Sequence, residues 1–284
     1  MTKRTKAILF PLLAAFLAFL TFWLWPRSLT ATHYEVPADL TAPVRVVQLT
    51  DLHGREFGEE NAELIALVAQ QQPDLILMTG DMLSDDGDAA VVCRLITALT
   101  EWAPVYFSYG NVESDRAEAG DTAWYAALEA AGATVLADSY TDVTVNGQAL
   151  RIGGYYGYYG AAHMDTKDPA LQAEKAAFST DFPQTDRQKI LLSHIPTGWL
   201  DWNYIDKYDA GIVFSGHYHG GLIRLPLVER GLFAPYAGFF PKYTGGLFMG
   251  SASACILSTG LDGRHGIPRI YNPPEICVAD LLPR

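Results

Sequence analysis

A chain of 284 residues, 49% of them hydrophobic, can bury a large core and suits one large domain. Its 32 acidic residues outnumber its 20 basic ones, which gives a formal net charge of −12. Such a surface repels polyanions, so no nucleic acid is expected as a partner and a secreted nuclease is disfavoured. The three cysteines lack Cys-x-x-Cys spacing, so buried thiols are expected, although one disulfide is compatible.

The N-terminal segment differs from the rest of the chain. Residues 1–6 are polar and basic, and residues 7–25 are apolar without a charge. At ~1.5 Å per residue this run can cross a hydrocarbon core of ~30 Å, whereas the apolar region of a cleaved signal peptide is shorter. Three basic residues precede the run and only Arg27 follows it closely. The positive-inside rule therefore places the N-terminus in the cytoplasm.

This pattern predicts three regions. Residues 1–27 form a cytoplasmic stub and a single-pass membrane anchor, residues 28–43 form a tether, and residues 44–284 form one domain on the extracytoplasmic side of the cell membrane. The tether is predicted because its segment contains prolines and polar residues and has no clear periodicity.

Beyond the tether, short apolar runs alternate with segments of helical spacing. This alternation predicts an α/β architecture in which helices pack over a largely buried sheet. The expected strands cover residues 44–49, 75–78, 105–107, 141–145, 148–152, 189–192 and 211–214. The expected helices cover residues 61–72, 89–102, 119–131 and 169–178. Asn146-Gly147 is a strong signal for a two-residue hairpin between two of the strands.

Five of these strands end, within two or three residues, in a side chain that can bind a metal ion. These side chains are Asp51 and His53, Asp81, Asn111, His194, and His217 with His219. In open α/β sheets, ligands bind beyond the carboxyl ends of the strands. One acidic or amide residue there is usually a helix cap or a turn residue. Seven such residues, including four of the seven histidines, are hard to ascribe to capping.

The residue types indicate which metals suit this set. In an extended segment His217 and His219 would lie on one side, with Tyr218 on the other, packed in the sheet. Mixed His, Asp and Asn ligands suit Mn, Fe or Zn better than Ca or Mg. Seven ligands are too many for one tetrahedral zinc but suit two ions. Two ions ~3.5–4 Å apart can clamp the oxygens of phosphoryl transfer, so hydrolysis of a phosphate ester is expected.

The ordered motifs resemble the calcineurin-like metallophosphoesterases, whose signature is Asp-x-His, Gly-Asp, Gly-Asn-His, His and Gly-His-x-His. The matching segments span residues 44–221 and are Asp51-Leu52-His53, Gly80-Asp81, Gly110-Asn111, His194 and Gly216-His217-Tyr218-His219. Further segments resemble the membrane-anchored bacterial YkuE/YaeI-type phosphodiesterases of this family. They include Gly220-Gly221, Arg224-Leu225-Pro226, Phe240-Pro241-Lys242-Tyr243 and Asn272-Pro273-Pro274-Glu275.

The resemblance implies a fold and an activity. The fold would be a four-layer α/β/β/α sandwich. Asp51, His53 and His219 would bind one divalent ion, Asn111, His194 and His217 the other, and Asp81 would bridge them. Mn²⁺ is preferred, with Fe or Zn as alternatives. A metal-bridging hydroxide would then hydrolyse a phosphodiester or pyrophosphate bond, with Asp81 and Asn111 as catalytic residues, in a lipid-linked or cell-envelope substrate.

One position departs from the family pattern. Val112 stands where the family has the histidine of Gly-Asn-His, which is thought to protonate the leaving oxygen or stabilise charge in the transition state. Three interpretations follow. The leaving group needs little protonation, another residue such as His163, Glu113 or Asp115 substitutes, or the protein is a catalytically silent metal-binding envelope protein.

The segment of residues 232–243 carries five aromatic residues and a lysine. It is either a loop packed on the sheet or a membrane-facing lip, since aromatic residues and lysine suit the bilayer interface. Arg224 and Lys242 are candidate phosphate contacts, although either can simply be solvated or paired.

Overall fold

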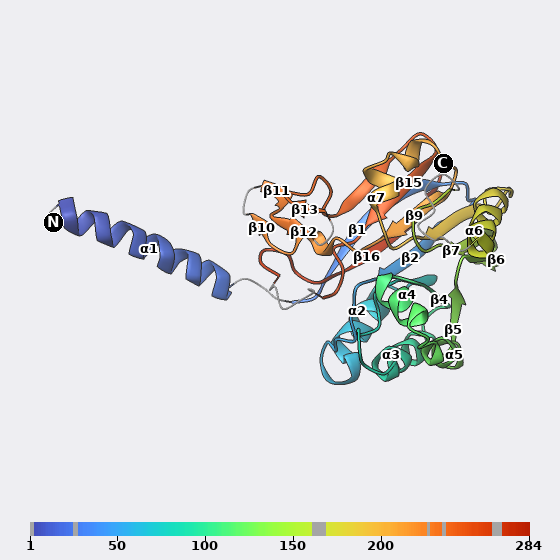
Figure 1. Cartoon of the computed structure of the whole chain (residues 1–284), viewed down its shortest axis with the longest axis horizontal. Coiled ribbons are helices and arrows are strands. Elements are labelled where there is room, and N and C mark those ends of the chain that lie inside the picture. Colours follow the sequence, from blue (N-terminus) through green and yellow to red (C-terminus); the bar gives the residue numbers. More distant parts are fainter. Residues whose placement is uncertain (1–2, 25–27, 161–168, 226–227, 235–236, 263–268) are drawn as a thin grey trace.

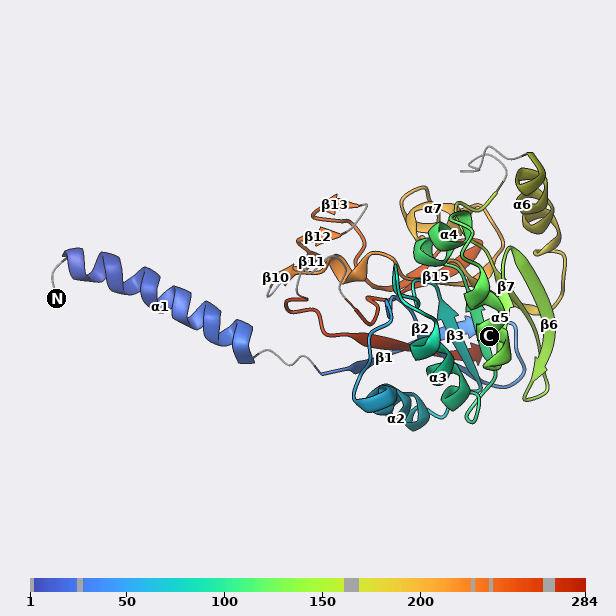
Figure 2. The same cartoon turned by 60° about the horizontal axis from the view of Figure 1, so that its bottom comes forward.

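The computed structural model describes residues 3–24, 28–160, 169–225, 228–234, 237–262 and 269–284. Its first helix, α1 (Lys3–Leu24), projects away from the rest of the chain, which folds around two β-sheets (Figure 1 and Figure 2). Within these residues, no helix is both long enough and apolar enough to cross a membrane. The membrane anchor stays a prediction.

Two six-stranded sheets form the centre of the domain. The first has the order β1-β16-β2-β3-β4-β5 and the second β14-β15-β9-β8-β7-β6. The first contains β1 (Thr30–Ala38), β16 (Glu275–Pro283), β2 (Val44–Leu49), β3 (Leu75–Thr79), β4 (Val105–Ser108) and β5 (Ala133–Leu136). The second contains β14 (Gly246–Met249), β15 (Ser253–Leu257), β9 (Gly211–Ser215), β8 (Gln188–Leu192), β7 (Gln148–Gly154) and β6 (Ser139–Val145). Strands β2 to β5 are parallel, as are β7, β8, β9 and β15, so their carboxyl ends lie at one edge of each sheet.

Helices cover the outer faces of both sheets. The helices of the domain are α2 (Ala62–Gln70), α3 (Ala90–Leu99), α4 (Asn111–Glu118), α5 (Ala123–Ala130), α6 (Pro169–Asp181) and α7 (Thr197–Leu200). One hydrophobic cluster lies between the sheets, a second joins the first sheet to α2, α3 and α5, and a third joins the second sheet to α6 and α7. Representative members are Leu77 and Phe214, Ile76 and Leu95, and Leu191 and Phe178, respectively. The predicted α/β sandwich is therefore confirmed.

The local patterns predicted some elements better than others. The hairpin at Asn146-Gly147 forms as expected, with Val145 paired to Gln148. The helix expected over residues 119–131 is α5, which is shorter. A separate helix, α4, precedes it and was not predicted. Its sequence, Asn-Val-Glu-Ser-Asp-Arg-Ala-Glu, has too few apolar residues to show a helical period. Cys93, Cys255 and Cys277 are free.

The prediction of a tether over residues 28–43 was wrong for β1. This strand pairs in parallel with β16 along its whole length, from Thr30 with Glu275 to Ala38 with Pro283. Val36 and Ala38 are fully buried in the cluster between the sheets. The sequence did not reveal this strand because its pairing partner lies at the far end of the chain. The folded domain therefore begins at Thr30, before the predicted boundary at residue 44.

A pair of substitutions separates a structural strand from a tether. Val36→Ala is expected to lower the free energy of unfolding by about 2 kcal/mol, because it removes two buried methyl groups and leaves a cavity. Glu35→Ala, next to it on the exposed face, is the control and should leave stability nearly unchanged. Chemical denaturation of the purified chain measures both. Equal midpoints for the two variants would support a tether instead.

Candidate metal centre

The seven predicted site residues converge at the carboxyl ends of five strands. Two of these residues follow β2, two follow β9, and one each follows β3, β4 and β8. The strands belong to both sheets, so the site lies where the two sheet edges meet. All seven side chains are buried or nearly so. They are Asp51, His53, Asp81, Asn111, His194, His217 and His219.

The first group consists of Asp51, His53 and His219. Each offers one ligand atom, and these three atoms lie within 4.8 Å of one another. The Nε2 atom of His219 is 3.6 Å from Oδ1 of Asp51, and the rings of His53 and His219 stack at 5.3 Å. A carboxylate and two imidazoles in this arrangement form a candidate site for one divalent ion.

The second group consists of Asp81, His194 and His217, whose ligand atoms also lie within 4.8 Å of one another. Nε2 of His194 is 3.3 Å from Oδ2 of Asp81. Asn111 joins this group through its Oδ1 atom, which is 3.0 Å from Nδ1 of His217. The structure thus divides the seven predicted residues into a first group of three and a second group of four that includes Asp81.

Asp81 faces both groups with the same oxygen. Its Oδ2 atom is 3.3 Å from His194 in the second group and 3.8 Å from His53 in the first. Its other oxygen, Oδ1, accepts a hydrogen bond of 2.9 Å from the backbone N–H of Val112 at the start of α4. One carboxylate oxygen is therefore held by the protein, and the other lies between the two sets of histidines.

Backbone carbonyls set the orientation of two of the imidazoles. Nδ1 of His194 is 2.8 Å from the carbonyl oxygen of Thr79, and Nδ1 of His219 is 2.9 Å from that of Asp262. Because a carbonyl can only accept, each Nδ1 is the donor. In the neutral ring Nε2 then carries the lone pair and points into the site. Such outer contacts are typical of metal-binding histidines.

Among the seven site residues, two buried side-chain nitrogen atoms lack a hydrogen-bond partner, which tests whether these residues fit a metal. Nε2 of His53 and Nε2 of His194 are both buried without such a partner, although each lies near the Asp81 carboxylate. Buried polar atoms are normally satisfied, so an unsatisfied imidazole nitrogen facing a carboxylate indicates room for a cation. The donor set, mixed nitrogen and oxygen, fits divalent transition metals.

The electrostatics of the site favour positive charge. Burial by itself would raise the pKa of Asp51 and Asp81, but the nearby histidines hold both pKa values below their ordinary range. Burial lowers the pKa of His194, but the Asp81 carboxylate outweighs it and raises this pKa to about 9. Burial and the neighbouring His194 lower the pKa of His217 to about 3. The site therefore attracts a proton and would attract a metal ion in its place.

The placement of the two histidines after β9 differs from the prediction. The strand ends at Ser215, and His217 and His219 have left-handed φ values of 73° and 46°. They are not in an extended segment, and they join different groups. Tyr218 packs away from the site as expected. It is buried, and its hydroxyl donates to Asp201 at 2.9 Å.

The position of the missing family histidine offers no evident proton donor among the residues that the structure describes. The Val112 side chain is 1% exposed and belongs to the hydrophobic cluster on the outer face of the first sheet. Glu113 is fully buried, and its two oxygens accept four backbone hydrogen bonds. The pKa of Glu113 is raised above its ordinary value, because burial and the charge of Asp81 outweigh the backbone hydrogen bonds, which lower it. Asp115 is exposed, and His163 lies outside the described residues.

Sequence reasoning missed the C-terminal loop that supports His219. The side-chain amide of Asn272 donates to the carbonyl of His219 at 2.7 Å. The guanidinium of Arg269 donates to the carbonyl of Asp262 at 2.8 Å, and that carbonyl in turn accepts from His219. Asn272 lies in the Asn-Pro-Pro-Glu segment, which was identified from the sequence only by its resemblance to the bacterial relatives. Its role could not be inferred because these contacts join residues far apart in the chain.

The two candidate phosphate contacts have other partners. Arg224 donates to the carbonyls of Gly220 and Thr244, both at 3.2 Å, so it ties the turn after His219 to a later loop. Lys242 lies over the ring of Tyr243, 4.6 Å from its centre. Neither residue stands among the two groups of the candidate metal centre.

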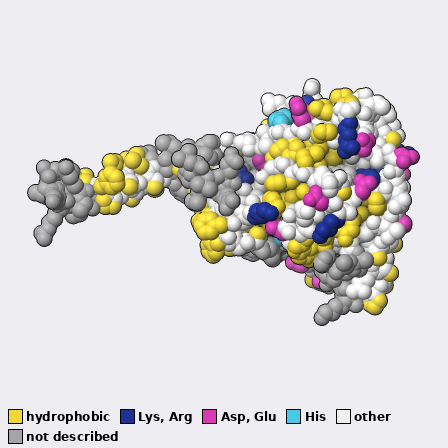
Figure 3. Space-filling model, turned by 90° about the horizontal axis from the view of Figure 1, so that it is seen from above, with side chains coloured by type: hydrophobic (Ala, Val, Ile, Leu, Met, Phe, Trp, Pro, Cys, Tyr) yellow, Lys and Arg dark blue, Asp and Glu magenta, His cyan; other side chains and the backbone are white. Residues whose placement is uncertain are grey.

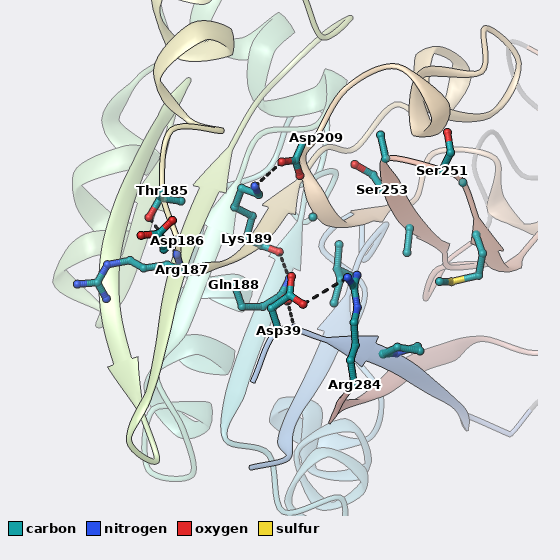
Figure 4. A pocket seen from close by; sticks show the side chains of 17 residues that line it. Asp39, Thr185, Asp186, Arg187, Gln188, Lys189, Asp209, Ser251, Ser253 and Arg284 are labelled. Atoms are coloured by element: carbon teal, nitrogen blue, oxygen red, sulfur yellow. Dashed lines mark hydrogen bonds and ion pairs between the residues drawn. The ribbon is translucent and has the colours of Figure 1, made fainter. Parts of the chain in front are cut away.

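A polar groove of about 640 Å³ lies at the other ends of the strands (Figure 4). The first residues of β8 and β9 line this groove, whereas the site residues follow the last residues of these strands. Lys189 pairs with Asp209 at 2.7 Å, and Arg284 pairs with Asp39 at 3.3 Å. These paired charges lie away from the candidate metal centre and take no part in it.

Several known proteins are similar to this chain. It is 25% identical over 248 residues to phosphodiesterase YaeI of Escherichia coli (strain K12), covering 86% of this chain and 84% of YaeI. It is also 25% identical over 271 residues to the uncharacterised metallophosphoesterase YkuE of Bacillus subtilis (strain 168), covering 91% and 87%. Among solved structures, a 5'-nucleotidase precursor from Thermus thermophilus aligns with a TM-score of 0.46 and 16% identity, covering 76% of this chain and 48% of that one.

The match to a family model covers the segment in which all seven residues lie. Residues 44–221 match the model of the calcineurin-like phosphoesterases, and this segment contains both groups of potential ligands. The chain therefore belongs to the calcineurin-like phosphoesterase family and is a metal-dependent phosphoesterase.

Proposed function

We propose that this protein hydrolyses a phosphodiester or pyrophosphate bond with two divalent metal ions. The observation that carries the proposal is the position of Asp81, one oxygen of which faces histidines from both groups. Asp51, His53 and His219 would hold one ion, and Asn111, His194 and His217 the other, with Asp81 shared. When bound, such a pair supplies an activated water and neutralises charge on the reacting phosphoryl group. Mn²⁺ suits this donor set, with Fe or Zn as alternatives.

The protein's own groups hold these ligands in place. The carbonyls of Thr79 and Asp262 keep Nε2 of His194 and His219 turned into the site. The N–H of Val112 holds one oxygen of Asp81, which leaves the other oxygen available to be shared. Asn111 stands at the first position of α4, with its side-chain oxygen next to His217. Preorganised ligands of this kind cost no reorganisation at the moment of reaction.

The side chains at and next to Val112 bear on which leaving groups a substrate of this protein can have. Val112 packs in a hydrophobic cluster, and the Glu113 carboxylate is committed to four backbone amides. Neither residue can give a proton to a leaving oxygen. A positioned general acid contributes typically 10²–10⁴-fold, and the described residues at this position do not supply one. A substrate whose leaving group needs little protonation fits best, such as a pyrophosphate or an activated ester.

We place the substrate at a membrane surface, in a lipid-linked or cell-envelope molecule. The side chains of α1 that the structure describes include Phe10, Phe16 and Phe19, which are 78%, 57% and 57% exposed. Exposed apolar side chains along a helix suit a bilayer anchor. With the N-terminus in the cytoplasm, the domain would stand outside the cell membrane. The family relative YaeI is named a phosphodiesterase.

A second feature supports a membrane-facing surface. The aromatic hairpin, formed by β12 (Phe233–Ala234), β13 (Gly238–Phe239) and the following Phe240, exposes 74% of Phe239 and 58% of Phe240. Strand β12 packs against the turn of residues 219–221. The hairpin lies on the same side of the domain as α1 (Figure 1 and Figure 2). Seen from above, hydrophobic side chains form patches, and Lys and Arg side chains are scattered among them (Figure 3).

Two other functions are less well supported. A metal-binding envelope protein without turnover is favoured only by the replacement of the family histidine with Val112. A nuclease is disfavoured by the net charge of −12, which repels a polyanionic substrate. Turnover measured alongside metal content separates the first of these from an active hydrolase.

Replacement of the shared carboxylate tests the metal centre. Asp81→Asn should lower turnover of an aryl phosphodiester by at least about 100-fold, because a neutral amide cannot balance two cations. The bound metal should fall from two ions per chain to one, as measured by elemental analysis. Asp86→Asn is the control because it makes the same change on an exposed residue of the same loop. Unchanged turnover in Asp81→Asn would refute the proposed reaction centre.

A series of leaving groups tests the absence of a general acid. The rate should depend steeply on leaving-group pKa, so that aryl phosphodiesters react at least about 100-fold faster than simple alkyl ones. The measurement is kcat/KM for a set of diesters that share one methyl ester and differ only in the leaving alcohol or phenol. A flat dependence would mean that another group protonates the leaving oxygen. No turnover of any member, with two metals bound, would favour the silent protein.

The aromatic hairpin can be tested with substrates in two physical states. Phe239→Ser combined with Phe240→Ser should lower hydrolysis of a lipid pyrophosphate in phosphatidylcholine vesicles by at least about tenfold, because two apolar side chains no longer insert. Hydrolysis of a soluble aryl diester should stay unchanged. Trp102→Ser is the control, since Trp102 is 53% exposed and precedes β4, at the other end of the strands. Equal losses on both substrates would contradict a membrane-facing role.

A further inference from the structure

Glu113 lies in the first turn of α4, two residues after Asn111, and its side chain is fully buried. The side chain turns back toward the loop that follows β3, away from the solvent. A buried carboxylate is costly unless its oxygens are satisfied by donors. What surrounds Glu113 is therefore informative about its role.

Four backbone N–H groups satisfy the Glu113 carboxylate. Oε2 accepts from Asp81 and from Gly110, both at 2.8 Å. Oε1 accepts from Met82 at 2.9 Å and from Leu83 at 3.0 Å. Three of these donors are consecutive in the loop after β3, and the fourth follows β4. One side chain thus joins the loop that carries Asp81 to the loop that carries Asn111.

The two loops are in close contact and need such a restraint. Asp81 has a left-handed φ of 52°, and Gly80 has φ of 85°. A Cβ atom on Gly80 would lie 2.4 Å from the backbone nitrogen of Gly110, and one on Gly110 would lie 2.3 Å from Oδ1 of Asp81. A residue other than glycine in the left-handed region costs about 1 kcal/mol or more, so other contacts must hold it there.

The first turn of α4 holds both the backbone and the side chain of Asp81. Its backbone N–H donates to Glu113, and its side-chain Oδ1 accepts from the N–H of Val112. These two hydrogen bonds run in opposite directions between the same two segments. Together they fix where the remaining oxygen, Oδ2, points. That oxygen is the one that lies between His53 and His194.

We infer that Glu113 is a positioning residue. By holding the backbone of the loop after β3, it keeps the Asp81 carboxylate between the two groups of potential metal ligands. The inference rests on the proposed two-metal function. It also gives position 113 a role different from that of a substitute proton donor, since its oxygens are used by backbone amides. The loss of Glu113 should therefore act on metal binding first and on turnover through it.

The test replaces Glu113 with glutamine in the full chain. In Glu113→Gln an NH₂ group faces two backbone donors, so two of the four amides lose their acceptor. Affinity for Mn²⁺ should fall by about 10–100-fold, the usual effect of removing a partner behind a ligand. Glu118→Gln, an exposed residue of the same helix, is the control and should bind like the wild type. Isothermal titration with Mn²⁺ measures affinity, at a temperature where circular dichroism shows all three proteins folded.

A purely structural role predicts a different result. Glu113→Gln would then melt at a lower temperature, while the folded molecules bound two Mn²⁺ ions with wild-type affinity, and this outcome would overturn the inference. If the variant does not fold, amide hydrogen exchange in the metal-free wild type tests the inference instead. The amides of Asp81, Met82, Leu83 and Gly110 should exchange at least about 100-fold more slowly than exposed loop amides. Exchange at the rate of exposed loops would overturn it.

The inference and the proposed function can fail separately. If Asp81→Asn abolishes turnover and metal sharing while Glu113→Gln binds Mn²⁺ like the wild type, only the role of Glu113 is wrong. If Asp81→Asn keeps full turnover and two metal ions, the shared-carboxylate centre itself is wrong, and the role of Glu113 fails with it.

Discussion

The rest of the site depends on the fixed position of the Asp81 carboxylate. This group is fully buried, so it must be balanced by donors and positive charge. One oxygen takes a backbone hydrogen bond from Val112, and the other faces His53 and His194. Because the two histidines come from different sheets, the position of one carboxylate couples the two halves of the sandwich. A pair of metal ions would complete a charge balance that the protein leaves open.

The packing of the two sheets makes this meeting possible. At the edge near the site, the Gln48 side chain donates to the hydroxyl of Thr79 and to the carbonyl of Ser215, which joins β2 and β3 to β9. Gly216 allows a close approach, because a Cβ atom there would lie 2.4 Å from Oδ2 of Asp51. The N–H of His217 also donates to Asp51 at 3.2 Å. Candidate ligands separated by more than a hundred residues, such as Asp51 and His217, are thus held together by direct contact between the sheet ends.

The segment after β4 shows how a family motif can change its function locally. The backbone of Val112 keeps its hydrogen bond to Asp81, while its side chain packs in the core. Metal binding needs only the first of these features, and leaving-group protonation needs a side chain that this position lacks. Glu113, next in the chain, is used for positioning. Among the described residues, the site therefore combines seven potential metal ligands with an apolar side chain at the position of the family histidine.

The sequence by itself determined the alternation of strands and helices, the hairpin at Asn146-Gly147 and the identity of the seven candidate ligands. These features are local, because each motif directly follows the apolar strand that positions it. The tertiary structure decided the features that depend on contacts between distant segments. It placed β1 in a sheet through its pairing with the C-terminal strand, and it separated His217 from His219 by left-handed backbone turns. It also turned Glu113 toward four amides, because only the folded chain brings the ends of β3 and β4 together.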